Sequence, residues 1–145
     1  MLTLAAGVDA IEIDRVERTL RRHPDRFLAR VFTKLEIAYC HDRVRELAVR
    51  FAAKEATMKA LGTGVRGVGW RDIEVLPDRR GKPLIYLHGR AAERAAQIGM
   101  GQPEVSMTHS DLLALAFVVA PCSKPIDYED ARAAFIERMK RRGRL

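Results

Sequence analysis

The longest helical pattern in the chain runs from about Glu46 to Leu61, and its apolar residues fall on two opposite faces. A helix that is apolar on two sides is packed on two sides, so we expect it to be the central element of the core. Gly62 follows at the position where a glycine commonly ends a helix. The larger apolar face carries Leu47, Phe51, Met58 and Leu61, and the smaller one carries Val49, Ala53, Ala56 and Ala60.

Shorter patterns on both sides of this helix alternate between helical and strand-like periods. Residues 2–13 predict a first strand, and two strand-like segments, 72–76 and 84–88, flank a turn rich in glycine and proline and predict a hairpin. The fold class that follows is α+β, with a small antiparallel sheet packed on the long central helix. Further helices are predicted at 14–22, in a short turn capped by Asp25, from a capping box at Thr33–Glu36 to about Asp42, and at 89–99. Further strands are predicted at 104–109 and 112–120, the last one buried.

Length and composition indicate a single domain that does not cross a membrane. A chain of 145 residues is long enough for a core of its own. No stretch could span a bilayer, and the short apolar start is interrupted by Asp9, so we expect a cytoplasmic protein without a membrane partner. Cys40 and Cys122 lack the spacing of a disulfide framework or a zinc site.

Positive charge is concentrated near the C-terminus. The net charge is +7, and residues 123–145 contribute +3 of it from seven basic and four acidic side chains. This balance favours anionic partners without requiring nucleic acid. Because Pro121 follows the last predicted strand, we divide the chain into a domain at 1–122 and a C-terminal extension at 123–145. In the extension, Asp127 can cap an amphipathic helix over 127–142 with a basic end, whose apolar side carries Tyr128, Ala131, Phe135 and Met139.

Ionised side chains are set among the alanines of the central helix. Burying a charge is unfavourable unless a partner or a metal compensates it. Glu55 and Lys59 are spaced i, i+4, which ordinarily means a helix-stabilising ion pair, and Arg50 and Lys54 precede them. Asp9, at the end of the first strand, suggests a different explanation. Two carboxylates from rigid elements, completed by water and phosphate oxygens, are what magnesium requires.

Three other features are weak indications when taken singly. The turn Gly62-Thr63-Gly64 offers backbone N–H groups and a hydroxyl without bulky side chains, which suits a phosphate. His109 lies at a strand end, where a single histidine more often has a structural role. Lys82 lies in a hairpin turn, Gly81-Lys-Pro83, that is ordinary by its chemistry.

Four blocks of the sequence, in order, resemble the motifs of the holo-acyl-carrier-protein synthases, the small 4′-phosphopantetheinyl transferases. The first is Gly7-Val-Asp-Ala-Ile-Glu-Ile-Asp-Arg15. The second is similar to the family signature almost residue for residue and reads Arg50-Phe-Ala-Ala-Lys-Glu-Ala-Thr-Met-Lys-Ala-Leu-Gly-Thr-Gly64. The third extends from Asp72-Ile-Glu-Val through Gly81-Lys-Pro83 to Leu87-His-Gly, and the fourth is Val105-Ser-Met-Thr-His109. Together they cover about residues 5–120.

The resemblance implies an enzyme that moves the phosphopantetheine arm of coenzyme A onto a serine of an apo-acyl carrier protein, in support of fatty acid biosynthesis. The second product would be adenosine 3′,5′-bisphosphate, and the assembly would be a homotrimer with active sites between neighbouring subunits. Mg²⁺, or Mn²⁺, would be held by Asp9 and Glu55. Glu55 or a bound water would accept the serine proton, and Lys59 would stabilise or protonate the departing phosphate.

The resemblance also assigns the binding residues. The charges of the central helix would face metal and phosphate, with Lys54 left without a role. Arginines on the helix at 14–22 would steer the acidic carrier protein. The residues implied for coenzyme A are Arg50, Lys59, Gly62, Thr63, Gly64, Lys82, Pro83 and His109, and those implied for the carrier protein are Arg15, Arg18 and Arg22.

Two features depart from the family pattern, and two alternatives stay open. The link between the Thr33 helix and the central helix is short, and the extension lies beyond the usual end of the family. We interpret the helix at 127–142 as a packing or trimer-edge element. One alternative is a basic module that binds RNA or an acidic protein, although Tyr128 and Phe135 lie on the apolar side rather than among the basic residues. The other is a different phosphotransferase with the same metal pair.

Overall fold

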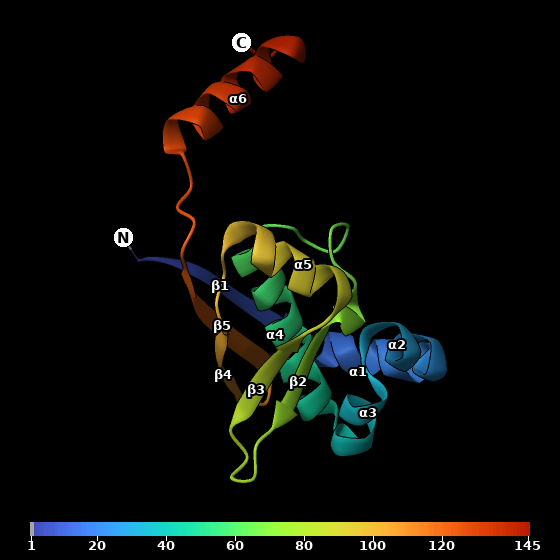
Figure 1. The fold of residues 1–145 in the computed structure, drawn as a ribbon. Helices are drawn as coiled ribbons and strands as arrows, with labels where there is room; N and C mark the ends of the chain where they lie inside the picture. The colour runs from blue at the N-terminus through green and yellow to red at the C-terminus, as the bar shows by residue number, and fades with distance from the viewer. Residues whose placement is uncertain (1) are drawn as a thin grey trace.

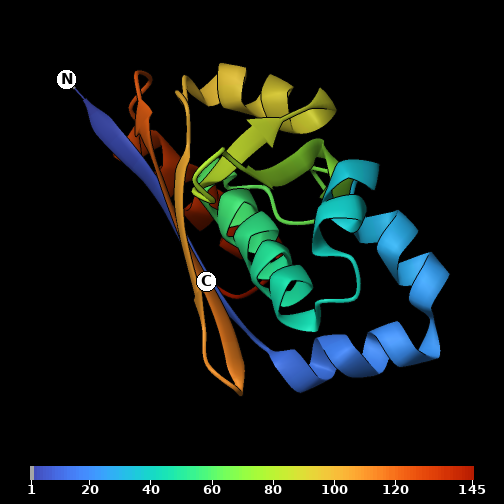
Figure 2. The same cartoon turned by 90° about the horizontal axis from the view of Figure 1, so that it is seen from below.

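A three-stranded antiparallel sheet covers one side of a long helix, α4 (Val44–Leu61), and the smaller elements lie on the other side (Figures 1 and 2). The computed structural model describes residues 2–145. The sheet has the order β1 (Thr3–Glu12), β5 (Leu113–Cys122), β4 (Glu104–His109), so that the last strand of the chain lies in its centre. The predicted α+β class with a small antiparallel sheet on a central helix is confirmed.

The central position of α4 follows from its small residues. Alanines at positions 52, 53 and 56 are fully buried and form one core with Ala116 and Val118 of β5. The helix begins two residues earlier than its periodicity indicated. It ends as expected before Gly62, which has the left-handed conformation with a φ of 71°. Packing on two sides, predicted from the pattern, is confirmed.

Three short helices and a hairpin complete the body. The helices are α1 (Ile13–Arg22), α2 (Pro24–Val31) and α3 (Lys34–Cys40), and the hairpin joins β2 (Ile73–Pro77) to β3 (Pro83–Leu87). A short 3₁₀ turn (Trp70–Asp72) precedes the hairpin, and α5 (Gly89–Ile98) follows it. The predicted capping box of Thr33 and Glu36 starts α3, but this helix ends at Cys40 because His41 turns the chain with a φ of 52°. Asp25 lies in the first turn of α2 and does not cap it.

One prediction about β5 is wrong. Instead of being buried throughout, this strand alternates, so that Leu113, Leu115 and Phe117 are exposed on the outer face of the sheet. Val8 of β1 pairs with Phe117 and is exposed on the same face. A run that is apolar on both sides does not reveal which side faces the core, so its composition alone could not distinguish full burial from an apolar outer surface.

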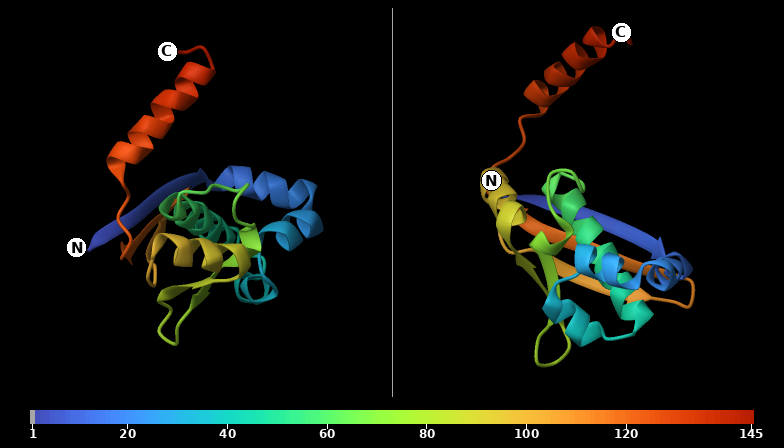
Figure 3. Two further views of the ribbon diagram at one scale, coloured as in Figure 1. Left: turned by 45° about the horizontal axis from the view of Figure 1, so that its top comes forward. Right: turned by 90° about the vertical axis from the view of Figure 1, so that its right-hand side faces the viewer.

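The last helix, α6 (Tyr128–Arg141), stands away from the body at the end of an extended segment (Figures 1 and 3). Its predicted cap is present, since the carboxylate of Asp127 accepts a hydrogen bond of 3.0 Å from the backbone N–H of Asp130. None of its residues is buried within the chain described here.

The part of the chain that the structure describes contains no helix long and apolar enough to cross a membrane. Cys40 and Cys122 are free, buried thiols, and burial raises the pKa of Cys40 to about 11.

Candidate active site

Gly7 allows strand β1 to touch the backbone of α4. A Cβ atom on Gly7 would lie only 1.9 Å from the carbonyl oxygen of Ala56, so that no other residue fits without displacing the strand. Asp9 lies two residues further along β1 and therefore faces the same side of the sheet. This close approach brings Asp9 next to Glu55, the neighbour of Ala56 on the helix.

Burial and the charge of Asp9 disfavour ionisation of Glu55. Partial burial raises the pKa of Glu55 above its ordinary value, and the charge of Asp9 and a hydrogen bond with its carboxyl group raise it further. Lys59 and Arg15 act in the opposite direction. The carboxyl group of Glu55 thus lies where a further positive charge would favour its ionised form.

Lys59 connects β1 to α4. Its Nζ donates a hydrogen bond of 2.9 Å to the carbonyl oxygen of Val8 and lies 3.3 Å from Oδ1 of Asp9. Among the ion pairs of the described residues, Lys59 pairs with Asp9 and not with Glu55, so the spacing i, i+4 does not produce the usual pair here. The lysine side chain is 57% exposed and can reach a ligand, whereas that of Asp9 is 12% exposed.

A cavity of about 340 Å³ opens beside these groups. Asp9, Glu55 and Arg15 line it together with apolar residues that include Phe27 and Phe51. Phe51 stacks on Trp70, with ring centroids 4.8 Å apart, which fixes this aromatic wall. The cavity thus has one charged side and one apolar side.

The predicted phosphate turn directly follows the last turn of α4. Gly62 and Gly64 both have φ near 70°, a region that favours glycine. The hydroxyl of Thr63 is buried without a hydrogen-bond partner among the described residues. A buried polar atom of this kind is unfavourable unless a ligand or water satisfies it.

The remaining residues expected at the coenzyme A site line a second cavity of about 450 Å³. Arg50, Lys82, Pro83 and His109 all border it. The guanidinium of Arg50 is already engaged, since it donates to the carbonyl oxygen of Val75 at 3.0 Å and to Glu46 at 2.7 Å. Within one chain, the residues of the second cavity lie apart from Asp9 and Glu55, because neither carboxylate borders that cavity.

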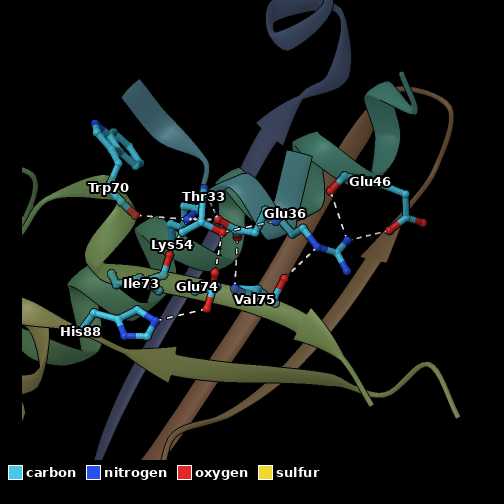
Figure 4. Close-up of polar contacts among 10 residues, drawn as sticks. Thr33, Glu36, Glu46, Lys54, Trp70, Ile73, Glu74, Val75 and His88 are labelled. Carbon is cyan, nitrogen blue, oxygen red and sulfur yellow. Dashed lines mark hydrogen bonds and ion pairs between the residues drawn. The ribbon is translucent and has the colours of Figure 1, made fainter. Parts of the chain in front are cut away.

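The expectation that the charges of α4 face a metal and a phosphate is wrong for Lys54. This lysine is fully buried, and its Nζ donates to Oε1 of Glu36 at 2.7 Å and to the carbonyl oxygens of Trp70 and Ile73 (Figure 4). Burial lowers the pKa of Lys54, and the charge of Glu36 opposes that change. The pair links three segments of the fold and has no contact with either cavity.

Glu36 is a residue that sequence reasoning missed in part. Its capping role was predicted, but its carboxylate also accepts a hydrogen bond of 3.1 Å from the backbone N–H of Val75. Glu74 extends the network, as Thr33 donates to it and His88 Nε2 lies 3.2 Å from it (Figure 4). Spacing along the chain contains no signal for these contacts between distant segments.

The arginines predicted to receive a carrier protein, Arg15, Arg18 and Arg22, lie on α1. They are exposed on α1, while the intervening Arg21 pairs with Glu17 at 2.7 Å. Arg15 also borders the cavity that contains Asp9 and Glu55. The arginine surface of α1 is therefore continuous with the candidate site.

The residues of the first cavity fit a divalent cation with few protein ligands. No group of three or more His, Cys, Asp or Glu side chains suited to a metal occurs within residues 2–145. Two adjacent carboxylates fit a hard cation that keeps several waters and takes phosphate oxygens as further ligands, as Mg²⁺ does. Burial and the charge of Asp9 raise the pKa of Glu55, and a cation held between the two carboxylates would oppose that shift.

Comparison with known proteins assigns the chain to a family. The model of the 4′-phosphopantetheinyl transferase superfamily matches residues 5–117. The chain therefore belongs to this superfamily. Within it, the chain is similar to the small holo-[acyl-carrier-protein] synthases, as the sequence motifs predicted. It is 49% identical over 123 residues to the synthase of Moorella thermoacetica, covering 83% of this chain and 95% of that protein.

Solved structures agree with this assignment. The Chronobacterium ammoniagenes ACPS–CoA complex has a TM-score of 0.76 and 30% identity, and the match covers 84% of this chain and 99% of that one. The Helicobacter pylori synthase in complex with coenzyme A has a TM-score of 0.73 and 31% identity, covering 79% and 98%. The matched family region ends before α6.

Proposed function

We propose that this chain transfers 4′-phosphopantetheine from coenzyme A to a serine of an apo-acyl carrier protein. The observation that carries the proposal is the contact of Asp9 with Glu55 and Lys59 beside an open cavity, in a chain whose relatives are named holo-[acyl-carrier-protein] synthases. Coenzyme A in complexes of two structural neighbours supports the donor substrate. We also propose that the reaction supports fatty acid biosynthesis.

The residues of the first cavity have distinct roles in this reaction. Asp9 and Glu55 would hold Mg²⁺, or Mn²⁺, which when bound neutralises charge on the pyrophosphate. The serine oxygen forms a bond to the phosphorus that carries pantetheine, and the bond from that phosphorus to the oxygen of adenosine 3′,5′-bisphosphate breaks. Glu55, or a water beside it, accepts the serine proton. Lys59 stabilises or protonates the departing phosphate.

We further propose that the complete site forms between neighbouring subunits of a homotrimer. The separation of the two cavities in one chain supports this, because a neighbour would supply Arg50, Lys82, Pro83 and His109 to the nucleotide. The outer face of the sheet supplies an apolar surface of the kind that subunit interfaces cover. Gly62, Thr63 and Gly64 would bind phosphate, and the unpaired hydroxyl of Thr63 favours this role.

Arg15, Arg18 and Arg22 would receive the carrier protein. Acyl carrier proteins are highly acidic, so that an exposed arginine surface beside the cavity steers them towards Glu55. The binding-module alternative finds no support in the relatives, whose names describe synthases.

The direct test is a mass measurement on the acceptor. Incubation of the protein with coenzyme A, Mg²⁺ and an apo-acyl carrier protein adds one phosphopantetheine to the carrier. An unchanged mass across several apo carriers contradicts transfer, and RNA binding with a steep salt dependence would then favour the binding module.

Mixed assemblies test the interface site. Glu55→Gln and His109→Ala would each impair transfer alone, but reassembly of an equal mixture creates interfaces where one chain supplies Glu55 and its neighbour supplies His109. About a quarter of the interfaces are then intact by random assortment. No recovery in the mixture would place the whole site within one chain.

A further inference from the structure

Tyr39 borders the second cavity, although no motif of the sequence assigns it there. It is the next-to-last residue of α3, and it lines the cavity of about 450 Å³ together with Arg50, Lys82 and His109. The residue is 38% exposed, so its ring forms part of the cavity wall without being enclosed by the core. The proposed transfer reaction places the nucleotide end of coenzyme A in this cavity, and the role of Tyr39 concerns the same substrate.

The short link between α3 and α4 fixes the position of Tyr39. Residues 41–43 alone connect the two helices, and Arg43 turns back onto the end of α3. Its Nη2 donates to the carbonyl oxygen of Tyr39 at 2.6 Å, and its Nε donates to the carbonyl oxygen of Cys40 at 3.2 Å. Its guanidinium carbon lies 4.8 Å from the centroid of the Tyr39 ring. The link that departs from the family pattern thus holds this ring at the cavity.

Arg50 has one nitrogen without a partner. Its Nε donates to the carbonyl oxygen of Val75 at 3.0 Å, and its Nη1 donates to the carboxylate of Glu46 at 2.7 Å and to the Glu46 carbonyl oxygen at 3.3 Å. These bonds leave the two N–H groups of Nη2 unused within residues 2–145. In the same residues, the one buried side-chain nitrogen or oxygen without a partner is the hydroxyl of Thr63. Nη2 is therefore accessible from the cavity that Arg50 lines.

The ring of Tyr39 contacts the guanidinium group that carries this nitrogen. The guanidinium carbon of Arg50 lies 4.7 Å from the ring centroid, within the range of a cation–π contact. Such a contact uses no N–H group. The ring therefore restrains Arg50 and leaves Nη2 for a ligand.

We propose that Tyr39 is a positioning residue for nucleotide binding, because its ring holds the guanidinium group of Arg50 with Nη2 directed into the second cavity. The inference rests on the proposed function, which supplies the nucleotide. Without the ring, the guanidinium group can turn so that both terminal nitrogens pair with the carboxylate of Glu46, a geometry that arginine and carboxylate frequently adopt. Nη2 would then no longer be available to the ligand.

The charges around Nη2 fit a phosphate group of the nucleotide. Lys82 and His109 border the same cavity as Arg50, and the carboxylate that borders it, Glu46, is already paired with Arg50. The Nζ of Lys82 lies 3.1 Å from Glu104, and both side chains are more than half exposed, so that this weak pair can open for an anion. A guanidinium group matches the geometry of phosphate oxygens. A phosphate is therefore the group that Nη2 is placed to receive.

Titration calorimetry with adenosine 3′,5′-bisphosphate tests the proposal on the full chain without the transfer reaction. Tyr39→Leu removes the aromatic face and should raise the Kd of the nucleotide about 5–20-fold. Tyr39→Phe keeps the aromatic face and should stay within about twofold of the wild type. Tyr86→Leu is the matched control and keeps the wild-type Kd, because Tyr86 is 45% exposed and borders a different cavity.

A double-mutant cycle separates positioning from a direct contact with the nucleotide. If Tyr39 acts through Arg50, adding Tyr39→Leu to Arg50→Met should change the Kd by less than about twofold. In the transfer assay, Tyr39→Leu should raise KM for coenzyme A and leave kcat within about twofold, because the nucleotide end is bound equally in the ground state and the transition state. Near-ultraviolet circular dichroism checks the fold of Arg50→Met, and the contrast between Tyr39→Leu and Tyr39→Phe does not depend on that variant.

Three outcomes would overturn the inference. Equal Kd values for the wild type and Tyr39→Leu exclude a positioning role, and equal losses in Tyr39→Phe and Tyr39→Leu exclude the aromatic face as its cause. A full further loss when Tyr39→Leu is added to Arg50→Met excludes action through Arg50. A wild type that adds phosphopantetheine to the carrier while Tyr39→Leu keeps the wild-type Kd retains the proposed function and loses the inference, whereas an unchanged carrier mass with the wild type is a failure of the proposed function itself.

Discussion

The two ionic groups on α4 differ in how completely their charges are compensated. Lys54 and Glu36 are both fully buried, and the three donors of the ammonium group have three acceptors in Glu36, Trp70 and Ile73. Asp9 and Glu55 are two like charges beside Lys59, which is more than half exposed, and Arg15, which is also exposed. We call the first group closed and the second open, because Asp9 and Glu55 border a cavity that a cation can enter.

This difference separates a structural role from a binding role better than charge or burial alone. Satisfied buried ions link the segments that contain them, since the loss of one partner leaves the other uncompensated. Unsatisfied ions beside a cavity favour a ligand of opposite charge. The same helix therefore stabilises the fold through Lys54 and holds the proposed reaction centre through Glu55.

The largest effect is expected at the open group. Glu55→Gln removes a proposed metal ligand and the proposed base, and we expect transfer to fall about 10³-fold. The acceptor mass over time measures the rate, and near-ultraviolet circular dichroism checks the fold. Glu17→Gln, an exposed carboxylate paired with Arg21, is the matched control and keeps the wild-type rate. A Glu55→Gln rate within tenfold of wild type would contradict the assignment.

Substitution of Lys54 in the closed group should instead lower the stability of the fold. Lys54→Met leaves the carboxylate of Glu36 buried without its partner, and the free energy of unfolding should fall by about 3–5 kcal/mol. Urea denaturation measures this change. The double variant Lys54→Met/Glu36→Gln should lose less than the sum of the single losses, because no unpaired charge remains. A loss below about 1 kcal/mol for Lys54→Met would refute the structural role.

Gly7→Ala tests the contact that brings the open group together. The added methyl group would lie 1.9 Å from the carbonyl oxygen of Ala56, so we expect a loss of about 1–3 kcal/mol and reduced transfer as Asp9 moves from Glu55. Gly143→Ala is the control, because nothing lies within 4 Å of its added methyl group, although its φ of 62° adds a backbone strain that Gly7 lacks. A loss in Gly7→Ala no larger than that in Gly143→Ala would contradict the role of the contact.

The smallest effect concerns pH. A carboxyl group whose pKa is raised on folding contributes stability that is present below its ordinary pKa of 4.5 and is lost as the pH rises through the raised value. Without metal, Glu55→Gln should therefore match the wild-type Tm at low pH and exceed it by about 1–3 °C at neutral pH. Calorimetry over this range measures the difference. A Tm of Glu55→Gln below that of the wild type at neutral pH would contradict the raised pKa of Glu55.

Local sequence patterns predicted the helices and strands of the fold, but they did not predict the contacts between distant segments. The periodicity around Leu47 and Ala53 identified the central helix, and Thr33 and Glu36 identified the start of α3. The outer face of β5 was misjudged because Leu115 and Phe117 are as apolar as the buried residues of that strand. The partner of Lys54 could not be predicted, since Glu36 is 18 residues away on another helix.

The candidate site was predicted as a set of residues, and its arrangement was not. The resemblance named Asp9, Glu55 and Lys59, which the structure brings together. It also named Arg50 and His109, which line a different cavity. Motifs preserve the identity of such residues but contain no information about which cavity each one lines.

The claim that the open group accepts a cation has a direct test in the metal dependence of Tm, measured without substrate. At a Mg²⁺ concentration ten times the Kd, the Tm of the wild type should rise by about 3–7 °C, because the cation neutralises Asp9 and Glu55. Glu55→Gln should show no such rise, whereas Glu17→Gln should behave as wild type. An equal rise in Glu55→Gln, or none in the wild type, would contradict the account.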